Sequence, residues 1–133
     1  MSKCLDRTTG KEYLVKIVDK LFYDTEEEVE VLLNYIQVLH RINHENVLQV
    51  MDTFSTSSNI YIVFEYYNGV DILNDIATRE EYSEKEAASV IKKILEATAC
   101  MHKNNVIHKD LKAENVLVDA EAGKLKIVDF GTA

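Results

Sequence analysis

The chain has 133 residues, of which 47% are hydrophobic and 29% charged, a balance typical of one folded globular domain and not of a disordered chain. Its formal net charge of −8 argues against a broad surface for nucleic acid or anionic membrane. Two cysteines are too few for a disulfide framework, and no apolar run approaches the roughly 18 residues that span a bilayer. We therefore expect a cytoplasmic, intracellular protein without membrane insertion.

The first half of the chain predicts strands around one helix. Residues 11–18 are rich in β-branched and aromatic side chains and follow a Thr9-Gly10 turn, which indicates a strand. An acidic first turn after Asp24-Thr25 begins a helix, whose apolar residues recur at helical spacing. Residues 47–54 and 59–65 are typical of two further strands joined by a polar hairpin loop.

The second half predicts two helices followed by short strands. A break at Asn68-Gly69 precedes a short helix over residues 71–78. Ser83 and Glu86 have the spacing of a capping box, so a long helix begins there. Short strands are expected at 106–107, 116–118 and 125–128, with a turn at 119–123. Strands followed by a helix-rich part indicate an α+β class.

One pair of motifs carries the chemistry: residues 108–115 (HKDLKAEN) and Asp129-Phe130-Gly131. Asp110 could accept the proton of a hydroxyl group, and Lys112 could stabilise a phosphoryl group in transfer. Asn115 and Asp129 supply the hard oxygen ligands that Mg²⁺ prefers. The alternative is a structural loop whose Asp and Asn side chains form turns and caps. The joint spacing of the two motifs argues against that alternative.

These motifs resemble the catalytic loop and the metal-binding triplet of protein kinases. The flanking sequences TGKEYLVKIVDK and KIVDFGTA are most similar to calcium-dependent and calcium/calmodulin-dependent serine/threonine kinases, and the serine/threonine class rests on Lys112. The resemblance implies an incomplete protein-kinase-like fold. Residues 1–67 would form a partial β-rich small lobe with one long helix. Residues 68–133 would form the first helices and catalytic-loop strands of the large lobe, ending just after Asp-Phe-Gly.

The resemblance also implies two cofactors, ATP and Mg²⁺, and a protein substrate. Asp110 and Lys112 would be catalytic, and Asn115 and Asp129 would bind the metal. The residues implied to contact ATP are the strand lysine Lys16, the gatekeeper Phe64, the hinge residues Glu65 and Tyr67, the ribose-contacting Asp71, and Leu117 beneath the adenine.

Several positions depart from the family pattern. The Gly-rich loop, the activation loop and the substrate-binding helices have no counterpart in the chain. Tyr35 stands where the family has the helix glutamate that pairs with Lys16, and a phenol cannot form that charge-assisted bond. Leu14 stands where a small alanine roofs the adenine, and would crowd a nucleotide. Glu28 lies two turns before Tyr35 and would reach Lys16 only if the helix shifted.

Two functions therefore stay open. The first is a protein serine/threonine kinase domain, truncated and with little or no activity as this chain alone. The second is a degenerate kinase-like module that serves binding or regulation. No EF-hand loop occurs, so calcium or calmodulin regulation is not encoded here, although the resemblance leaves it open. A zinc site at His40 and His44 lacks a third ligand, and a Cys100–His102 pair has no supporting pattern.

Overall fold

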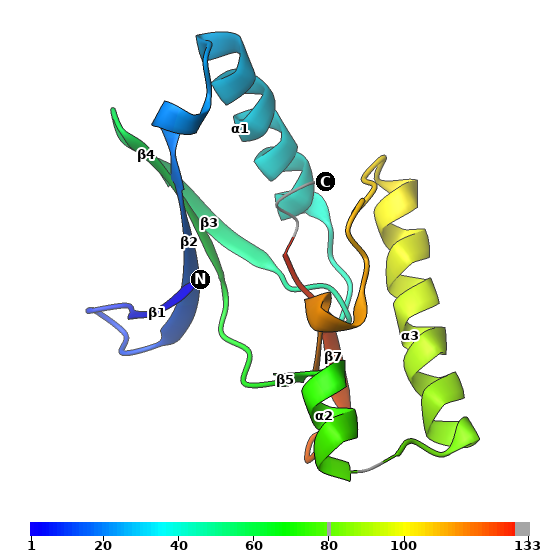
Figure 1. Ribbon diagram of the computed structural model, residues 1–133. Coiled ribbons are helices and arrows are strands. Elements are labelled where there is room, and N and C mark those ends of the chain that lie inside the picture. Colours follow the sequence, from blue (N-terminus) through cyan, green and yellow to red (C-terminus); the bar gives the residue numbers. More distant parts are fainter. Residues whose placement is uncertain (80, 130–133) are drawn as a thin grey trace. The chain divides into compact units, whose positions relative to one another are not determined.

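The computed structural model describes residues 1–79 and 81–129, and it divides into two compact units. Unit 1 comprises Met1–Arg41 and Gln49–Tyr67, whereas unit 2 comprises Ile42–Leu48 and the chain from Asn68 onward. The chain is coloured along its sequence in Figure 1. The assignment of residues 1–67 and 68–133 to two kinase lobes stays a prediction, and packing groups Ile42–Leu48 with the later part of the chain.

Unit 1 is built on an antiparallel sheet with the strand order β1-β2-β4-β3. Its strands are β1 (Ser2–Leu5), β2 (Glu12–Asp19), β3 (Val50–Ser55) and β4 (Asn59–Glu65). Along β4, buried Ile60, Ile62 and Phe64 alternate with half-buried residues, because successive side chains point to opposite faces of a strand. The predicted strands at 11–18 and 59–65 are confirmed.

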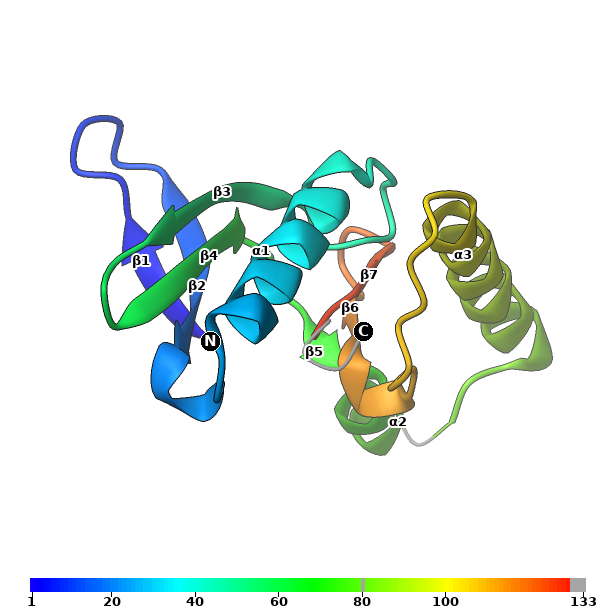
Figure 2. The same ribbon diagram turned by 90° about the horizontal axis from the view of Figure 1, so that it is seen from above.

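The helix α1 (Glu26–Arg41) packs beside β3, as Figures 1 and 2 show. It begins with a capping box that the sequence analysis missed. The Thr25 hydroxyl accepts a hydrogen bond from the Glu28 N–H at 3.2 Å. In return, the Glu28 carboxylate accepts from the N–H groups of Asp24 at 2.8 Å and Thr25 at 3.3 Å. Glu28 therefore fixes the start of its own helix, which is the position where its charge is also favoured by the helix dipole.

Unit 2 contains a smaller sheet with the order β5-β6-β7. Its elements are β5 (Val70–Asp71), α2 (Ile72–Arg79), α3 (Glu84–Lys103), the 3₁₀ turn η2 (Ala113–Asn115), β6 (Val116–Asp119) and β7 (Lys124–Ile127). Helix α2 contacts β5 and β6, and α3 contacts β7 (Figure 1). The predicted capping box of α3 is confirmed, because Ser83 Oγ accepts from Glu86 N and the Glu86 carboxylate accepts from Ser83 N.

The core of unit 2 uses only part of the apolar face of α3. Met101 and Ile127 are 0% exposed and Val116 is 2% exposed. On the same helix, Ile91 is 53% and Leu95 62% exposed, so these two apolar side chains point to solvent. Within the described residues, no helix combines the length and the apolar character needed to cross a bilayer.

The segment Ile42–Leu48 extends the sheet of unit 2. Leu48 N donates to Ile127 O at 3.0 Å, and Ile127 N donates to Asn46 O at 2.8 Å, which gives a parallel bridge between Val47 and Ile127. The Asn46 side chain adds a hydrogen bond to Leu125 O at 3.0 Å. The prediction of one strand over residues 47–54 is therefore wrong at its start, since β3 begins only at Val50.

The strand predicted at residues 106–107 is also wrong. Val106 is buried, but its N–H donates to Met101 O at 3.0 Å and closes the end of α3. Asn105 before it has a φ of 59°, in the left-handed region that commonly ends helices. Val106 therefore closes the end of a helix, and neither of the two apolar residues belongs to a strand.

Candidate functional site

The loop between α3 and β6 brings three of the predicted site residues together. Lys112 Nζ lies 2.8 Å from the Asp110 carboxylate. Asn115 Nδ2 donates to the Asp110 carbonyl at 2.8 Å and to its carboxylate at 3.0 Å. Asn115 is buried, whereas the side chains of Asp110 and Lys112 are 38% and 49% exposed. The cluster is thus anchored from within the unit and open to a ligand from outside.

His108 joins this loop to the end of β7. Its ring is 4% exposed, and its Nδ1 accepts from Asp110 N at 3.3 Å. Its Nε2 therefore carries the proton and donates to Val128 O at 3.0 Å. The sequence analysis quoted His108 within the motif but gave it no role. The sequence gives no signal for this contact, because Val128 lies 20 residues away.

Two residues of the site have a strained backbone. Lys109 has a φ of 66° and Asp129 a φ of 60°, both in the left-handed region that is uncommon for residues other than glycine. Such conformations cost roughly 1–3 kcal/mol each and cluster at functional sites. Both residues thus belong to the two sequence motifs, whereas Asn105, the third non-glycine residue with a positive φ in the described part of the chain, ends α3. Phe130 and Gly131 of the second motif lie outside the described residues.

The Lys112 ammonium group holds the pKa of the Asp110 carboxyl below its usual range. The hydrogen bond from Asn115 acts in the same direction, and partial desolvation opposes both. Conversely, Asp110 raises the pKa of Lys112. At neutral pH the pair is therefore a carboxylate and an ammonium group, ready to accept a proton and to compensate a negative charge.

We expect Lys112→Ala to raise the pKa of Asp110 toward its ordinary value. In the unsubstituted chain, Asp110 keeps its charge until the pH falls below the ordinary aspartate range, because its pKa is lowered by its partner. A ¹³C NMR titration of the aspartate carboxyl groups measures this shift. Lys109→Ala removes a neighbouring exposed charge and is the matched control; the same Asp110 pKa in both variants would contradict the expectation.

The predicted residues of unit 1 lie on β2 and β4 or just after them. Lys16 stands on β2 opposite Ile62, and Phe64 on β4 is 3% exposed. Glu65 ends β4, and its carboxylate accepts a hydrogen bond from Gln49 N at 2.9 Å, which gives this residue a structural role. Tyr67 lies two residues after Glu65 and is the last residue of the segment Gln49–Tyr67 of unit 1.

In unit 2, two predicted residues face each other across strands. Asp71 on β5 is the register partner of Leu117 on β6. The Asp71 carboxylate also accepts from Asn74 N at 3.0 Å and so caps the start of α2. Asp129 comes two residues after β7 ends. The structure thus groups Asp110, Lys112 and Asn115 by direct contacts. The other predicted residues lie on strands of their own unit, except Tyr67 and Asp129, which follow β4 and β7.

A family model for the protein kinase domain matches residues 1–133. The chain belongs to the protein kinase domain family. Calcium-dependent protein kinase 4 of Plasmodium falciparum (isolate 3D7) is 35% identical over 95% of this chain, which covers 24% of that relative. Calcium/calmodulin-dependent protein kinase type 1 of Caenorhabditis elegans is 38% identical over 92% of this chain and 35% of its own length.

A solved kinase structure has the same fold. The crystal structure of Rad53 1-466 in complex with AMP-PNP superimposes with a TM-score of 0.85 and 28% identity, covering 97% of this chain and 33% of that one. The predicted α+β, partial protein-kinase-like fold and the resemblance to serine/threonine kinases are therefore confirmed. The chain spans about a quarter of the length of the first curated relatives that it matches.

One departure from the kinase pattern lies on α1. Tyr35 is half-buried and precedes the buried Ile36. Burial raises the pKa of its hydroxyl above the ordinary tyrosine value, so the group is neutral at physiological pH. The chain therefore carries a neutral phenol at the position where the resemblance expects a carboxylate.

The donor set of the two motifs fits a magnesium ion better than a zinc ion. The amide nitrogen of Asn115 is held by Asp110, which leaves its carbonyl oxygen as the group that can bind a cation. The Asp129 carboxylate would be a second donor of hard oxygen. Mg²⁺ prefers such ligands and completes its coordination with phosphate oxygens and water. In the described ranges, no three His, Cys, Asp or Glu side chains gather as a metal site, so the zinc alternative at His40 and His44 gains no support.

Proposed function

We propose that this chain provides part of an ATP-dependent protein serine/threonine kinase. The observation that supports it most directly is the cluster of Asp110, Lys112 and Asn115. Phosphoryl transfer depends on positioning and charge compensation more than on covalent catalysis. The substrate hydroxyl oxygen would bond to phosphorus as the bond to ADP breaks, and its proton would pass to the Asp110 carboxylate. Lys112 would compensate the charge of the transferred group.

The cofactors of this proposal are ATP and Mg²⁺. The Rad53 structure is a complex with AMP-PNP, which supports a nucleotide as ligand for this fold. Asn115 and Asp129 would hold the metal, which would offset the charge of the phosphates. The proposed nucleotide contacts are Lys16, Phe64, Glu65 and Tyr67 from unit 1 and Asp71 and Leu117 from unit 2.

The substrate class and setting are inferred from the relatives. Their names include calcium-dependent, calcium/calmodulin-dependent and ribosomal protein S6 kinases. We therefore propose a protein serine or threonine hydroxyl as acceptor and an intracellular location. Any regulation by calcium or calmodulin would depend on residues outside this chain. That this chain alone has little or no kinase activity stays a prediction.

A degenerate kinase-like module is the second candidate, and two residues favour it. Tyr35 is a neutral group in the place of the expected carboxylate. Leu14 lies directly opposite Phe64 in the pairing of β2 and β4, so two large side chains are neighbours on one face of the sheet. A nucleotide would have to fit beside both, and overpacking of this kind costs roughly 1–3 kcal/mol.

A thermal shift with Mg²⁺-ATP separates the two candidates. A kinase should melt at a higher temperature with the nucleotide, because ligand at a hundred times Kd adds about 2.7 kcal/mol of stability. We expect Tyr35→Glu to increase this shift by supplying a charged partner for Lys16, and Tyr35→Phe to leave it unchanged or reduce it. The absence of any shift, in the original chain and in Tyr35→Glu, would support the degenerate module.

A further inference from the structure

The segment that joins β2 to α1 in unit 1 exposes two large apolar side chains. It contains the short 3₁₀ helix η1 (Lys20–Phe22), which lies beside the start of α1 in Figures 1 and 2. Leu21 is 87% and Phe22 85% exposed, the highest fractions among the large hydrophobic residues that the structure describes. Apolar residues scattered singly over a surface are normal, whereas neighbouring large ones form the kind of patch that marks an interaction site.

Hydrogen bonds hold the backbone of η1 in place. Asp19 Oδ1 accepts from Leu21 N at 2.9 Å at the start of this short helix. Lys20 N donates to Ser58 O at 2.9 Å, which joins η1 to the hairpin loop between β3 and β4. Leu21 and Phe22 are therefore presented from a fixed backbone, and a partner that covers them needs to order little more than their side chains.

The residues that follow this apolar pair are acidic. Four exposed residues with carboxylates come within eight positions of Phe22: Asp24, Glu26, Glu27 and Glu30. Among the residues that the structure describes, no cation lies within ion-pair distance of these four carboxylates. Lys20 is the only cation of residues 19–31, and its Nζ already donates to Thr56 O. Four residues span at most about 14 Å, so Phe22 and Glu26 can contact the same partner segment.

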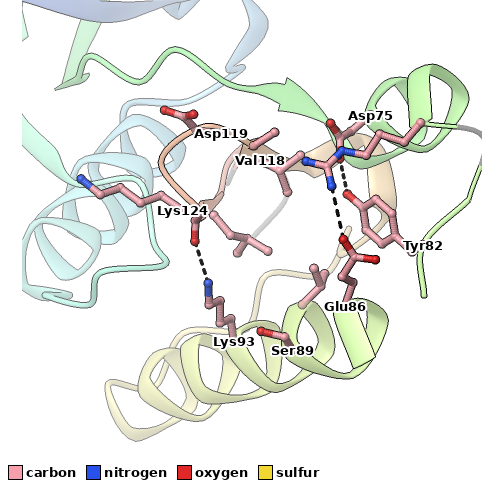
Figure 3. A pocket seen from close by; sticks show the side chains of 13 residues that line it. Asp75, Tyr82, Glu86, Ser89, Lys93, Val118, Asp119 and Lys124 are labelled. Carbon is pink, nitrogen blue, oxygen red and sulfur yellow. Dashed lines mark hydrogen bonds and ion pairs between the residues drawn. The ribbon is translucent and has the colours of Figure 1, made fainter. Parts of the chain in front are cut away.

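This one-sided charge distinguishes the segment from the pocket in unit 2. That pocket, between α2, α3 and the turn from β6 to β7, is lined by equal numbers of acidic and basic side chains (Figure 3), so its charge selects no partner. The carboxylates before and within α1 would repel a nucleic acid, an anionic membrane or the same segment of a second copy. They attract lysine and arginine. The charge therefore selects a basic segment of a protein as the occupant.

We propose that the segment between β2 and α1 binds a basic amphipathic helix of a partner protein. Leu21 and Phe22 insert between apolar side chains that recur along one face of that helix at i, i+3, i+4 and i+7. Lysine or arginine side chains at the edges of this face pair with Glu26 and Glu27. Val31 is 63% exposed and lies one helical turn after Glu27, so it extends the apolar contact along α1. This binding does not depend on phosphoryl transfer, because residues 19–31 contain none of the proposed catalytic, metal or nucleotide residues.

Fluorescence anisotropy with the full chain tests the proposal. The probe is a labelled peptide of about 15 residues with leucine at helical spacing and lysine elsewhere, and the comparison peptide has glutamate in place of each lysine. We expect saturable binding of the basic peptide that weakens with added salt, and no binding of the acidic one. Leu21→Ser/Phe22→Ser should lower the affinity about tenfold or more, because both apolar contacts are lost. Glu26→Gln/Glu27→Gln should lower it by about two- to thirtyfold, since each exposed ion pair is a modest contribution.

The matched control for charge is Glu81→Gln/Glu84→Gln. It removes the same number of exposed carboxylates at the start of another helix, α3, so the affinity should stay unchanged. Leu21 and Phe22 are exposed, so their double variant should keep the melting temperature of the original chain. An equal loss of affinity in the control would show a general attraction of basic peptides to a chain of net charge −8 and would overturn the proposal. Unchanged affinity in Leu21→Ser/Phe22→Ser, no saturable binding at millimolar peptide, or self-association of the chain that this double variant abolishes would each overturn it as well.

Discussion

In the kinase of which we propose this chain to be a part, replacing Asp110 by asparagine is expected to reduce phosphate transfer from Mg²⁺-ATP to a serine peptide by about 10²- to 10⁴-fold, the usual contribution of a general base. The substitution keeps the size of the side chain but removes the charge that Lys112 and Asn115 stabilise. An amide cannot take up the hydroxyl proton. The rate is measured as the incorporation of labelled phosphate into the peptide at saturating ATP.

The same experiment needs a control for folding and for nucleotide binding. Asp52→Asn makes the same chemical change at an exposed position of unit 1 and should leave the rate unchanged. The thermal shift with Mg²⁺-ATP should persist in Asp110→Asn, because Asp110 would contact the substrate hydroxyl and not the nucleotide. A variant that transfers phosphate at the original rate would remove Asp110 from the proposed mechanism.

Met101→Ala is expected to destabilise the protein by about 2–5 kcal/mol, the range observed when large buried side chains are truncated. Met101 is 0% exposed, and the N–H group of Val106 bonds to its carbonyl oxygen at the end of α3. The cavity would therefore lie where the helix meets the core of unit 2. Denaturant titration followed by circular dichroism gives the difference in the free energy of unfolding.

Leu95→Ala is the matched control on the same helix. Leu95 is 62% exposed, so its truncation should change the free energy of unfolding by less than about 0.5 kcal/mol. Both variants remove a large apolar side chain from α3 and differ mainly in burial. Equal losses in the two variants would show that the burial of α3 differs in solution from the packing described above.

The sequence was most informative where local signals are complete within a few residues. The capping box of Ser83 and Glu86 marks the start of α3, and the apolar run in residues 59–65 after a polar loop indicates β4. The errors occurred where the partner lies far away in the chain. Val47 and Leu48 are as apolar as any strand, but the backbone bonds on either side of Val47, from Leu48 N and to Asn46 O, join Ile127 of β7. Local periodicity contains no information about which edge will accept a segment.

The site shows the same limit. Asp110, Lys112 and Asn115 could be predicted because they lie within one short motif, and their direct contacts follow from that spacing. The role of His108 depends on a carbonyl oxygen at Val128, 20 residues away, which no local pattern reveals. Asp71, in contrast, caps a helix through a partner only three residues away, which is a pattern that a sequence can indicate. Such a side chain has a structural task in addition to any contact with a ligand.

The membership of Ile42–Leu48 in unit 2 has a consequence for the order of synthesis. Asn46 precedes its partner Leu125 by 79 residues. At roughly 5–20 residues per second, a ribosome would complete that distance in about 4–16 s. During this interval Val47 and Leu48 lack the strand that later buries them, and they are available to chaperones or to other nascent chains. A chain cut after Tyr67 would also leave the segment Ile42–Leu48 on a different fragment from the rest of unit 2. The two units are therefore not two separate stretches of the sequence.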